Sequence, residues 1–288
     1  MPARSEAMVA EAAEPAEGAL QTAPPADAWE ALRRFTPARI ALGRSGSSLP
    51  TRALLEFARA QAQARDAVHA PSQRDPLLAQ LAADGFAALP VHSAAADRAG
   101  YLRRPDLGRR LDAASRERLG HWAAAERERS APGVVFIVAD GLSPQAAVRH
   151  ALPLLRILRG AMDGASMGPV VVADLARVAL GDEIGQLLGA RQVVVLIGER
   201  PGLSAPDSLG AYLTHGPRIG RTDAERNCVS NIRPEGLDYP AAARRLRFLM
   251  AGAVRLGKSG VELKDESPAL GAQAQEEIGQ APRGQAPA

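Results

Sequence analysis

Short apolar runs, each followed by a turn, dominate the middle of the chain. Three of them cover residues 134–139, 168–174 and 192–197. Within each run the apolar residues are continuous and do not alternate with polar ones, which is typical of strands buried on both faces of a sheet. We therefore predict three strands with helices on both sides.

Helical stretches accompany these strands. Residues 144–160 begin at Pro144, directly after the favoured capping residue Ser143, and carry leucines at helical spacing. A shorter helix is predicted over residues 181–188, and a helix over residues 239–256 closes the domain. This order predicts an α/β fold with a doubly wound parallel sheet of the Rossmann-like type.

The chain before this domain has a different pattern of apolar and polar residues. Residues 51–68 form an amphipathic helical pattern, and further helices are predicted over residues 75–84 and 115–129. The first 28 residues hold alanines, acids and four prolines but no large aliphatic pair, so burial cannot offset the entropy cost of ordering them. A short targeting or docking helix over residues 6–20 stays open as the alternative.

Four parts are therefore expected along the chain. They are a disordered tail over 1–28, a mainly helical N-terminal region over 29–131, an α/β domain over 132–258 and a frayed C-terminal tail over 259–288.

Composition narrows the class of protein. Hydrophobic residues make up 46% and charged residues 23% of the chain, as in globular proteins. No apolar run reaches the roughly 18 residues that a membrane span requires, and the first residues lack the pattern of a secretory signal. We expect a cytosolic protein that binds neither membrane nor nucleic acid, since the net charge is only +3 and aromatic residues are 3%.

Ligands of open parallel sheets bind beyond the carboxyl ends of the strands. In this chain those ends are residues 140–143, 174–178 and 198–202. The chain has no GxGxxG fingerprint after the first strand, no GxSxG elbow and no HExxH motif, and its five histidines and single cysteine lack the spacing of a metal site. We interpret it as a ligand-binding domain and predict no catalytic residue and no metal ligand.

Three residues near these ends are candidates for ligand contact. Glu199 lies in a glycine-flanked turn, where it either accepts hydrogen bonds from a ligand or pairs with an internal arginine. Cys228 is more typical of a small buried hydrophobe than of a nucleophile, and Val178 of core packing. The residues alone leave these alternatives open.

Two further features have both an anion-binding and a plain interpretation. Arg103, Arg104, Arg109 and Arg110 form either a hydrated face or an interface for carboxylates or phosphates. The glycine-serine turn over residues 43–48 resembles an anion-binding loop but lacks the lysine and the spacing of one. In both cases the plain interpretation is favoured.

Six strings in series resemble the small subunit (light chain) of ethanolamine ammonia-lyase. They are RIALGR at 39–44, LRRPDLGRRL at 102–111, ADGLS at 139–143, GDEIG at 181–185, IGERPGL at 197–203 and RNCVSNI at 226–232. Each string is short, but together they lie in order and with fitting spacing between about residues 35 and 256.

The resemblance implies an adenosylcobalamin-dependent enzyme that converts ethanolamine to acetaldehyde and ammonia. In that family a large subunit with a barrel fold holds the substrate, and the small subunit covers the cofactor at the interface of a hetero-oligomer. Carried over by position, Val178, Glu199 and Cys228 are the small-subunit contacts to cobalamin. The resemblance also favours contact between the arginines of residues 103–110 and the large subunit, and it leaves packaging in a bacterial microcompartment open.

A non-catalytic cobalamin-binding carrier or scaffold subunit of another complex is the alternative. Many such carriers supply the histidine of a DxHxxG motif as the lower ligand of cobalt. No histidine of this chain has that context, so the sequence favours cobalamin that keeps its own base on the metal.

Overall fold

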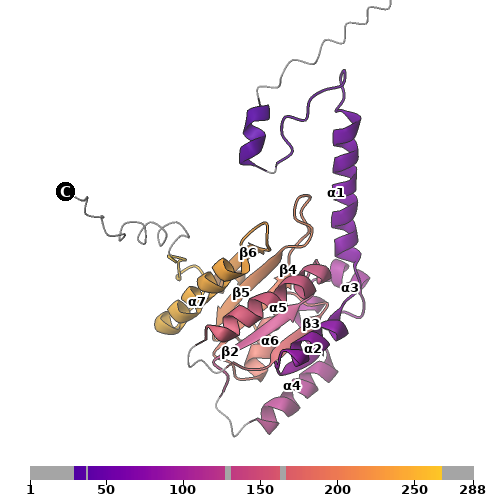
Figure 1. Ribbon diagram of the computed structural model, residues 1–288. Helices are drawn as coiled ribbons and strands as arrows, with labels where there is room; N and C mark the ends of the chain where they lie inside the picture. The colour runs from indigo at the N-terminus through magenta and orange to yellow at the C-terminus, as the bar shows by residue number, and fades with distance from the viewer. Residues whose placement is uncertain (1–28, 37, 127–130, 163–166, 268–288) are drawn as a thin grey trace, which may run out of the picture. The chain divides into compact units, whose positions relative to one another are not determined.

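The computed structural model describes residues 29–36, 38–126, 131–162 and 167–267 (Figure 1). The chain divides into two compact units, Met1–Ala53 and Leu54–Ala288. The predicted disordered tail and residues 268–288 of the predicted C-terminal tail lie outside the described residues. The beginning of the C-terminal tail is described, and there the side-chain amide of Asn227 donates to the carbonyl of Leu263 at 2.8 Å.

The first unit contains the 3₁₀ helix η1 (Glu30–Phe35) and a tight glycine-serine turn. In the turn, the N–H of Ser45 donates to the carbonyl of Ser48 at 2.8 Å, and the N–H of Ser48 donates back at 3.1 Å. Gly46 between them adopts the left-handed backbone conformation that glycine tolerates best. The turn precedes helix α1 (Thr51–His69), which continues into the second unit and confirms the predicted amphipathic helix.

The second unit is built on one six-stranded sheet with the order β1-β3-β2-β4-β5-β6. Its strands are β1 (Ala88–His92), β2 (Val134–Ala139), β3 (Val170–Asp174), β4 (Gln192–Gly198), β5 (Leu209–His215) and β6 (Arg226–Ile232). Strands β1 to β4 are parallel, whereas β5 is antiparallel to β4 and β6 is antiparallel to β5. The α/β fold and the three predicted strands are confirmed. The sheet is mixed and mostly parallel, so the predicted parallel sheet is confirmed for β1 to β4 and does not extend to β5 and β6.

Strands β5 and β6 are absent from the prediction because neither is a continuous apolar run. In β6, Val229 and Ile232 are buried, whereas Cys228 and Ser230 are exposed. Such alternation is typical of a strand with one buried and one open face, and β6 lies at the edge of the sheet. An antiparallel hairpin thus extends the parallel sheet on one side.

Strand β1 lies within residues 29–131, which we predict to be mainly helical. Helical segments do make up much of this region, and after α1 they are α2 (Arg74–Ala83), α3 (Arg98–Arg103), η2 (Leu107–Arg109) and α4 (Ala113–Ala125). However, β1 pairs with β3 in parallel, with Ala88 opposite Val170. It carries Pro90, which a strand at the edge of a sheet tolerates. This region therefore contributes directly to the sheet.

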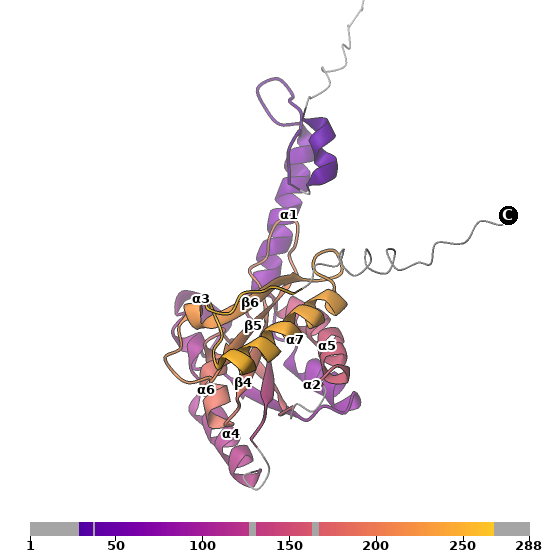
Figure 2. The ribbon, with the colours of Figure 1, turned by 90° about the vertical axis from the view of Figure 1, so that its left-hand side faces the viewer.

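Helices cover both faces of the sheet (Figure 2). The remaining helices are α5 (Pro144–Gly160), α6 (Leu180–Leu187) and α7 (Tyr239–Leu256), which match the three helices predicted for the domain to within one residue. Helices α2, α5 and α7 pack on one face around Phe136 and Leu196, and α4 and α6 pack on the other around Ile137 and Val195. Because neighbouring residues of a strand point to opposite faces, the continuous apolar runs fill both cores.

Ser143 occupies the N-cap position of α5, but the prediction that its side chain caps this helix is wrong. Its hydroxyl donates instead to the carbonyl of Pro206 at 3.1 Å. This contact fastens the segment between β4 and β5, which begins at Glu199, to the start of α5. Helix α7, by contrast, is capped by the carboxylate of Asp238, which accepts the N–H of Ala241 at 2.7 Å.

Candidate functional site

The turns that follow β2, β3 and β4 meet at one edge of the sheet, as predicted. The N–H of Leu142 donates to the carbonyl of Gly198 at 2.9 Å, which joins the first turn to the third. A Cβ atom on Gly141 would lie 2.3 Å from that carbonyl oxygen, and one on Gly198 would lie 2.1 Å from the carbonyl oxygen of Ser143. Only glycine permits this approach of two backbones.

A cavity of about 420 Å³ opens beside these turns, and we call it the carboxyl-end cavity. Its lining residues are Tyr101, Gly141, Leu142, Arg177, Val178, Ile197, Gly198, Glu199, Arg200 and Tyr212. Two of the three predicted contact residues, Val178 and Glu199, therefore line one cavity. The third, Cys228, lies beside it on the neighbouring strand β6.

Glu199 is half-buried at the end of β4. One carboxylate oxygen, Oε2, accepts the N–H of Asn231 at 3.2 Å. The other, Oε1, lies over Gly210, where an added Cβ atom would be only 2.9 Å away. No arginine of the described chain forms an ion pair with Glu199, so the alternative of an internal arginine partner is wrong and the carboxylate keeps acceptor capacity toward the cavity.

Tyr212 connects the predicted residues, although no local pattern in the sequence singles it out. It lies opposite Cys228 in the pairing of β5 with β6, lines the cavity with Val178 and Glu199, and shares a side-chain hydrogen bond with the Cys228 thiol. Burial raises the pKa of the Tyr212 phenol, and Cys228 and Glu199 add to the rise. Tyr212 is therefore a neutral side chain at physiological pH.

Cys228 is exposed, so the expectation of a small buried hydrophobe is wrong. Neighbouring atoms nevertheless remove enough water from the thiol to raise its pKa. The hydrogen bond from Tyr212 lowers this pKa, whereas the negative charge of Glu199 raises it further. A raised pKa leaves little thiolate at neutral pH. The environment fits a contact residue and not an activated nucleophile.

A group of charged side chains surrounds Tyr101, which lines the cavity together with Arg177. The Tyr101 ring lies between the guanidinium carbons of Arg98 and Arg177, at 4.8 and 4.2 Å from its centroid. Arg98 donates to the carbonyl of Gly141 at 2.8 Å and pairs with Asp140 at 3.3 Å. Burial raises the pKa of the Asp140 carboxyl to about 6, although the N–H of Ala176 and the charge of Arg98 oppose the rise.

The four arginines of residues 103–110 separate into two pairs. Arg103 donates to the carbonyl of Ala99 at 3.3 Å, and Arg104 pairs with Asp106 at 2.8 Å. Arg109 and Arg110 instead line a second cavity of about 850 Å³, which we call the arginine cavity. It adjoins the carboxyl-end cavity, because Arg177, Val178 and Tyr212 line both.

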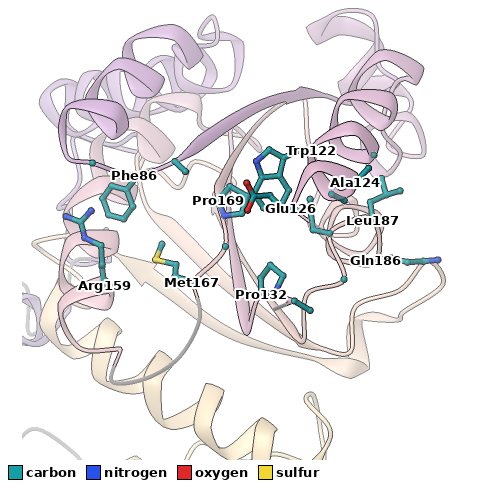
Figure 3. A pocket seen from close by; sticks show the side chains of 18 residues that line it. Phe86, Trp122, Ala124, Glu126, Pro132, Arg159, Met167, Pro169, Gln186 and Leu187 are labelled. Atoms are coloured by element: carbon teal, nitrogen blue, oxygen red, sulfur yellow. The ribbon is translucent and has the colours of Figure 1, made fainter. Parts of the chain in front are cut away.

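A third cavity, of about 960 Å³, lies at the opposite edge of the sheet, where the parallel strands begin (Figure 3). Figure 3 shows Phe86, Arg159 and Met167 on one side of it and Leu187 on the other. The guanidinium of Arg159 lies 3.9 Å above the Phe86 ring and also donates to the carbonyl of Asp84. The guanidinium of Arg159 is thus engaged in contacts within the chain. None of the predicted contact residues lines this third cavity.

The described ranges contain no group of three or more His, Cys, Asp or Glu side chains that could hold a metal ion. Among their helices, none combines the length and the apolar character that a bilayer crossing requires.

Comparison with known proteins gives one consistent result. Residues 26–264 match the family model described as ethanolamine ammonia-lyase light chain (EutC). The chain is 58% identical over 242 residues to the ethanolamine ammonia-lyase small subunit of Ralstonia nicotianae, and the aligned residues cover 82% of this chain and 88% of the relative. It is 56% identical over 241 residues to the corresponding subunit of Azotobacter vinelandii, which covers 83% and 88%.

Proposed function

Because the chain belongs to the ethanolamine ammonia-lyase light-chain family, we propose that its carboxyl-end cavity is the small-subunit part of a cobalamin site. Membership makes the chain a component of a carbon–nitrogen lyase, and it implies a cobalamin-dependent enzyme with a large-subunit partner. The observation that carries the proposal is the convergence of Val178, Glu199 and Cys228 around Tyr212 on one face of the sheet.

The chemistry of these residues fits a corrinoid. The rim of a corrin carries amide side chains, and a carboxylate such as Glu199 accepts hydrogen bonds from amide N–H groups. Val178 supplies an apolar wall, and Gly210 leaves room for the carboxylate of Glu199. The protonated Tyr212 and Cys228 add contact area without adding charge.

The volume of the cavity indicates a shared site. About 420 Å³ lies in the lower part of the range for small-molecule pockets and cannot enclose a whole cobalamin. The small subunit therefore covers one side of the cofactor, and the large subunit completes the enclosure. We propose that residues 29–131 supply contacts to that subunit, as the resemblance implies.

Adenosylcobalamin, when bound, supplies the radical chemistry that converts ethanolamine to acetaldehyde and ammonia. The residues of this chain bind and orient the cofactor and exclude water from one of its sides. The lining of the carboxyl-end cavity contains no histidine and no lysine. We propose that proton transfer to or from the substrate belongs to the large subunit.

Cofactor titration of the reconstituted complex tests this function. With its large subunit the chain should release ammonia from ethanolamine, and alone it should not. Glu199→Ala should weaken cobalamin binding by about 1–3 kcal/mol, or roughly five- to 150-fold in Kd, because a buried hydrogen bond is lost. Glu117→Ala on α4, which is 73% exposed, is the matched control. An unchanged Kd for Glu199→Ala would remove Glu199 from the site, and ammonia release by the chain alone would contradict the division of labour.

A further inference from the structure

The arginine cavity contains two exposed cations that form no ion pair with a carboxylate of the described residues. They are Arg109 and Arg110, which line it, and Arg110 is near enough to Asp106 to add to the lowering of the pKa of that carboxyl. We propose that Arg109 and Arg110, together with Arg177, bind the phosphodiester in the nucleotide loop of cobalamin. This inference rests on the proposed function and assigns a second contact region to the same cofactor.

The acids of the same cavity are already neutralised. Asp106 pairs with Arg104 at 2.8 Å, and its pKa is lowered chiefly by that contact. The other two pairs are Asp182 with Arg226 at 2.7 Å and Glu183 with Arg116 at 2.6 Å. The fourth acid, Asp223, is 96% exposed and lies 3.5 Å from Arg226. Three of the four acids thus have an arginine of their own, whereas Asp223 shares Arg226 and is open to solvent. Arg109 and Arg110 take no part in these pairs.

Arg177 extends this positive region to the carboxyl-end cavity. The backbone N–H of Arg177 donates to the carbonyl of Gly108 at 2.8 Å. This hydrogen bond joins the segment before Arg109 to the turn after β3. The guanidinium of Arg177 packs on the Tyr101 ring, and its buried Nε has no hydrogen-bond partner in the part of the chain that the structure describes. A buried donor without a partner is costly, so an acceptor supplied by a ligand stabilises this arrangement.

Gly108 makes this packing possible. A Cβ atom at this position would lie 2.9 Å from Cγ of Arg177 and 2.9 Å from the Tyr101 ring. The absence of a side chain at Gly108 therefore leaves room for Arg177 to pack against Tyr101 beside Arg109 and Arg110.

The ligand chemistry follows from the charges of cobalamin. Its corrin rim carries neutral amides, whereas its nucleotide loop carries one phosphodiester anion. Guanidinium groups match phosphate oxygens with paired N–H donors, and such charge-assisted hydrogen bonds are stronger than neutral ones. Val178 and Tyr212 line both cavities. The carboxylate of Glu199, which accepts from the corrin amides, and the arginines, which bind the phosphate, therefore lie along one continuous surface.

A comparison of cobalamin with cobinamide tests the inference, because cobinamide keeps the corrin and its amides but lacks the nucleotide loop and its phosphate. The complex with the large subunit is titrated with cyanocobalamin and with cyanocobinamide, and the visible spectrum gives each Kd. Arg109→Gln with Arg110→Gln should raise the Kd of cyanocobalamin about tenfold or more and leave that of cyanocobinamide unchanged. The dependence of the cyanocobalamin Kd on salt should also become weaker.

Matched variants separate the possible results. Arg103→Gln, at the end of α3 and outside the lining of the cavity, should change neither Kd. An equal loss for both corrinoids, or weaker association of the two subunits with an unchanged cobalamin Kd, would overturn the phosphate assignment, and the latter would assign the arginines to the large subunit. Glu199→Ala should weaken both corrinoids, so its failure would count against the proposed function and not against the arginine site.

Discussion

The carboxylate of Glu199 lies over Gly210, with Oε1 only 2.9 Å from the place of the missing Cβ atom. Gly210 is on β5, opposite Ile197 near the end of β4. The absence of a side chain at one position of β5 therefore allows the end of β4 to present its carboxylate over the sheet. The orientation of Glu199 depends on a residue that itself offers no functional group.

Gly210→Ala should therefore weaken cobalamin binding by the complex several-fold, because the methyl group displaces the Glu199 carboxylate. The unfolding free energy of the chain should change by less than about 1 kcal/mol, since the displaced atoms are the end of a flexible side chain. Cofactor titration and urea unfolding measure the two effects. Gly120→Ala on α4, where an added Cβ atom meets nothing within 4 Å, is the control. Unchanged cofactor affinity for Gly210→Ala would show that Glu199 does not need this space.

The reactivity of Cys228 reports on the same surface, because it is the only cysteine of the chain. Tyr212→Phe removes the hydrogen bond that lowers the thiol pKa, so the pKa should rise and alkylation by iodoacetamide at pH 8 should slow. Glu199→Gln removes a negative charge that raises this pKa, so alkylation should become faster. The rate measured against pH on the full chain gives both shifts. Shifts in the same direction would contradict this arrangement of Glu199, Tyr212 and Cys228.

The buried Asp140 should make stability depend on pH. Its folded-state pKa of about 6 lies above the ordinary value of 3.8, so its contribution is full below about pH 4 and is lost as pH rises through about 6. Asp140→Asn does not titrate, so between pH 4 and pH 7 the unmodified chain should lose on the order of 3 kcal/mol of unfolding free energy relative to this variant. Urea unfolding at several pH values measures the difference. Asp75→Asn, at an 81% exposed side chain, should show no such trend.

The ion pair between Arg226 and Asp182 is buried, with side chains 2% and 3% exposed. Arg226 also donates to the hydroxyl of Thr214 at 2.8 Å. Asp182→Ala should cost about 3–5 kcal/mol of unfolding free energy, because it leaves a buried guanidinium without its counter-charge. Lys258→Ala breaks a pair that is more than half exposed and should cost less than about 1 kcal/mol. Equal costs in urea unfolding would refute this ranking.

The location of the site could be predicted from the sequence because it depends on local patterns. The continuous apolar runs identify β2, β3 and β4 as strands buried on both faces, and the ligand edge follows from their direction. Val178 lies in the turn that follows β3 and Glu199 directly after β4, so both are expected at the edge where the parallel strands end.

Tyr212 could not be predicted in the same way. Its closeness to Cys228 depends on the pairing of two antiparallel strands, and a register irregularity between Leu209 and Ala211 interrupts that pairing. No local spacing records which residues face each other across such a hairpin. The partition of the four arginines is likewise set by the turn at Gly108 and not by their spacing in the sequence.

The hydrogen bond from Leu142 to Gly198, with no room for a side chain at Gly141 or Gly198, also has a dynamic consequence. Neither turn can shift without displacing the other, so the floor of the carboxyl-end cavity moves as one body. Adjustment to a ligand is left to rotatable side chains such as Glu199 and Arg177. A ligand of this cavity would therefore meet a surface formed during folding, and little of its binding free energy would be spent on ordering the backbone beneath it.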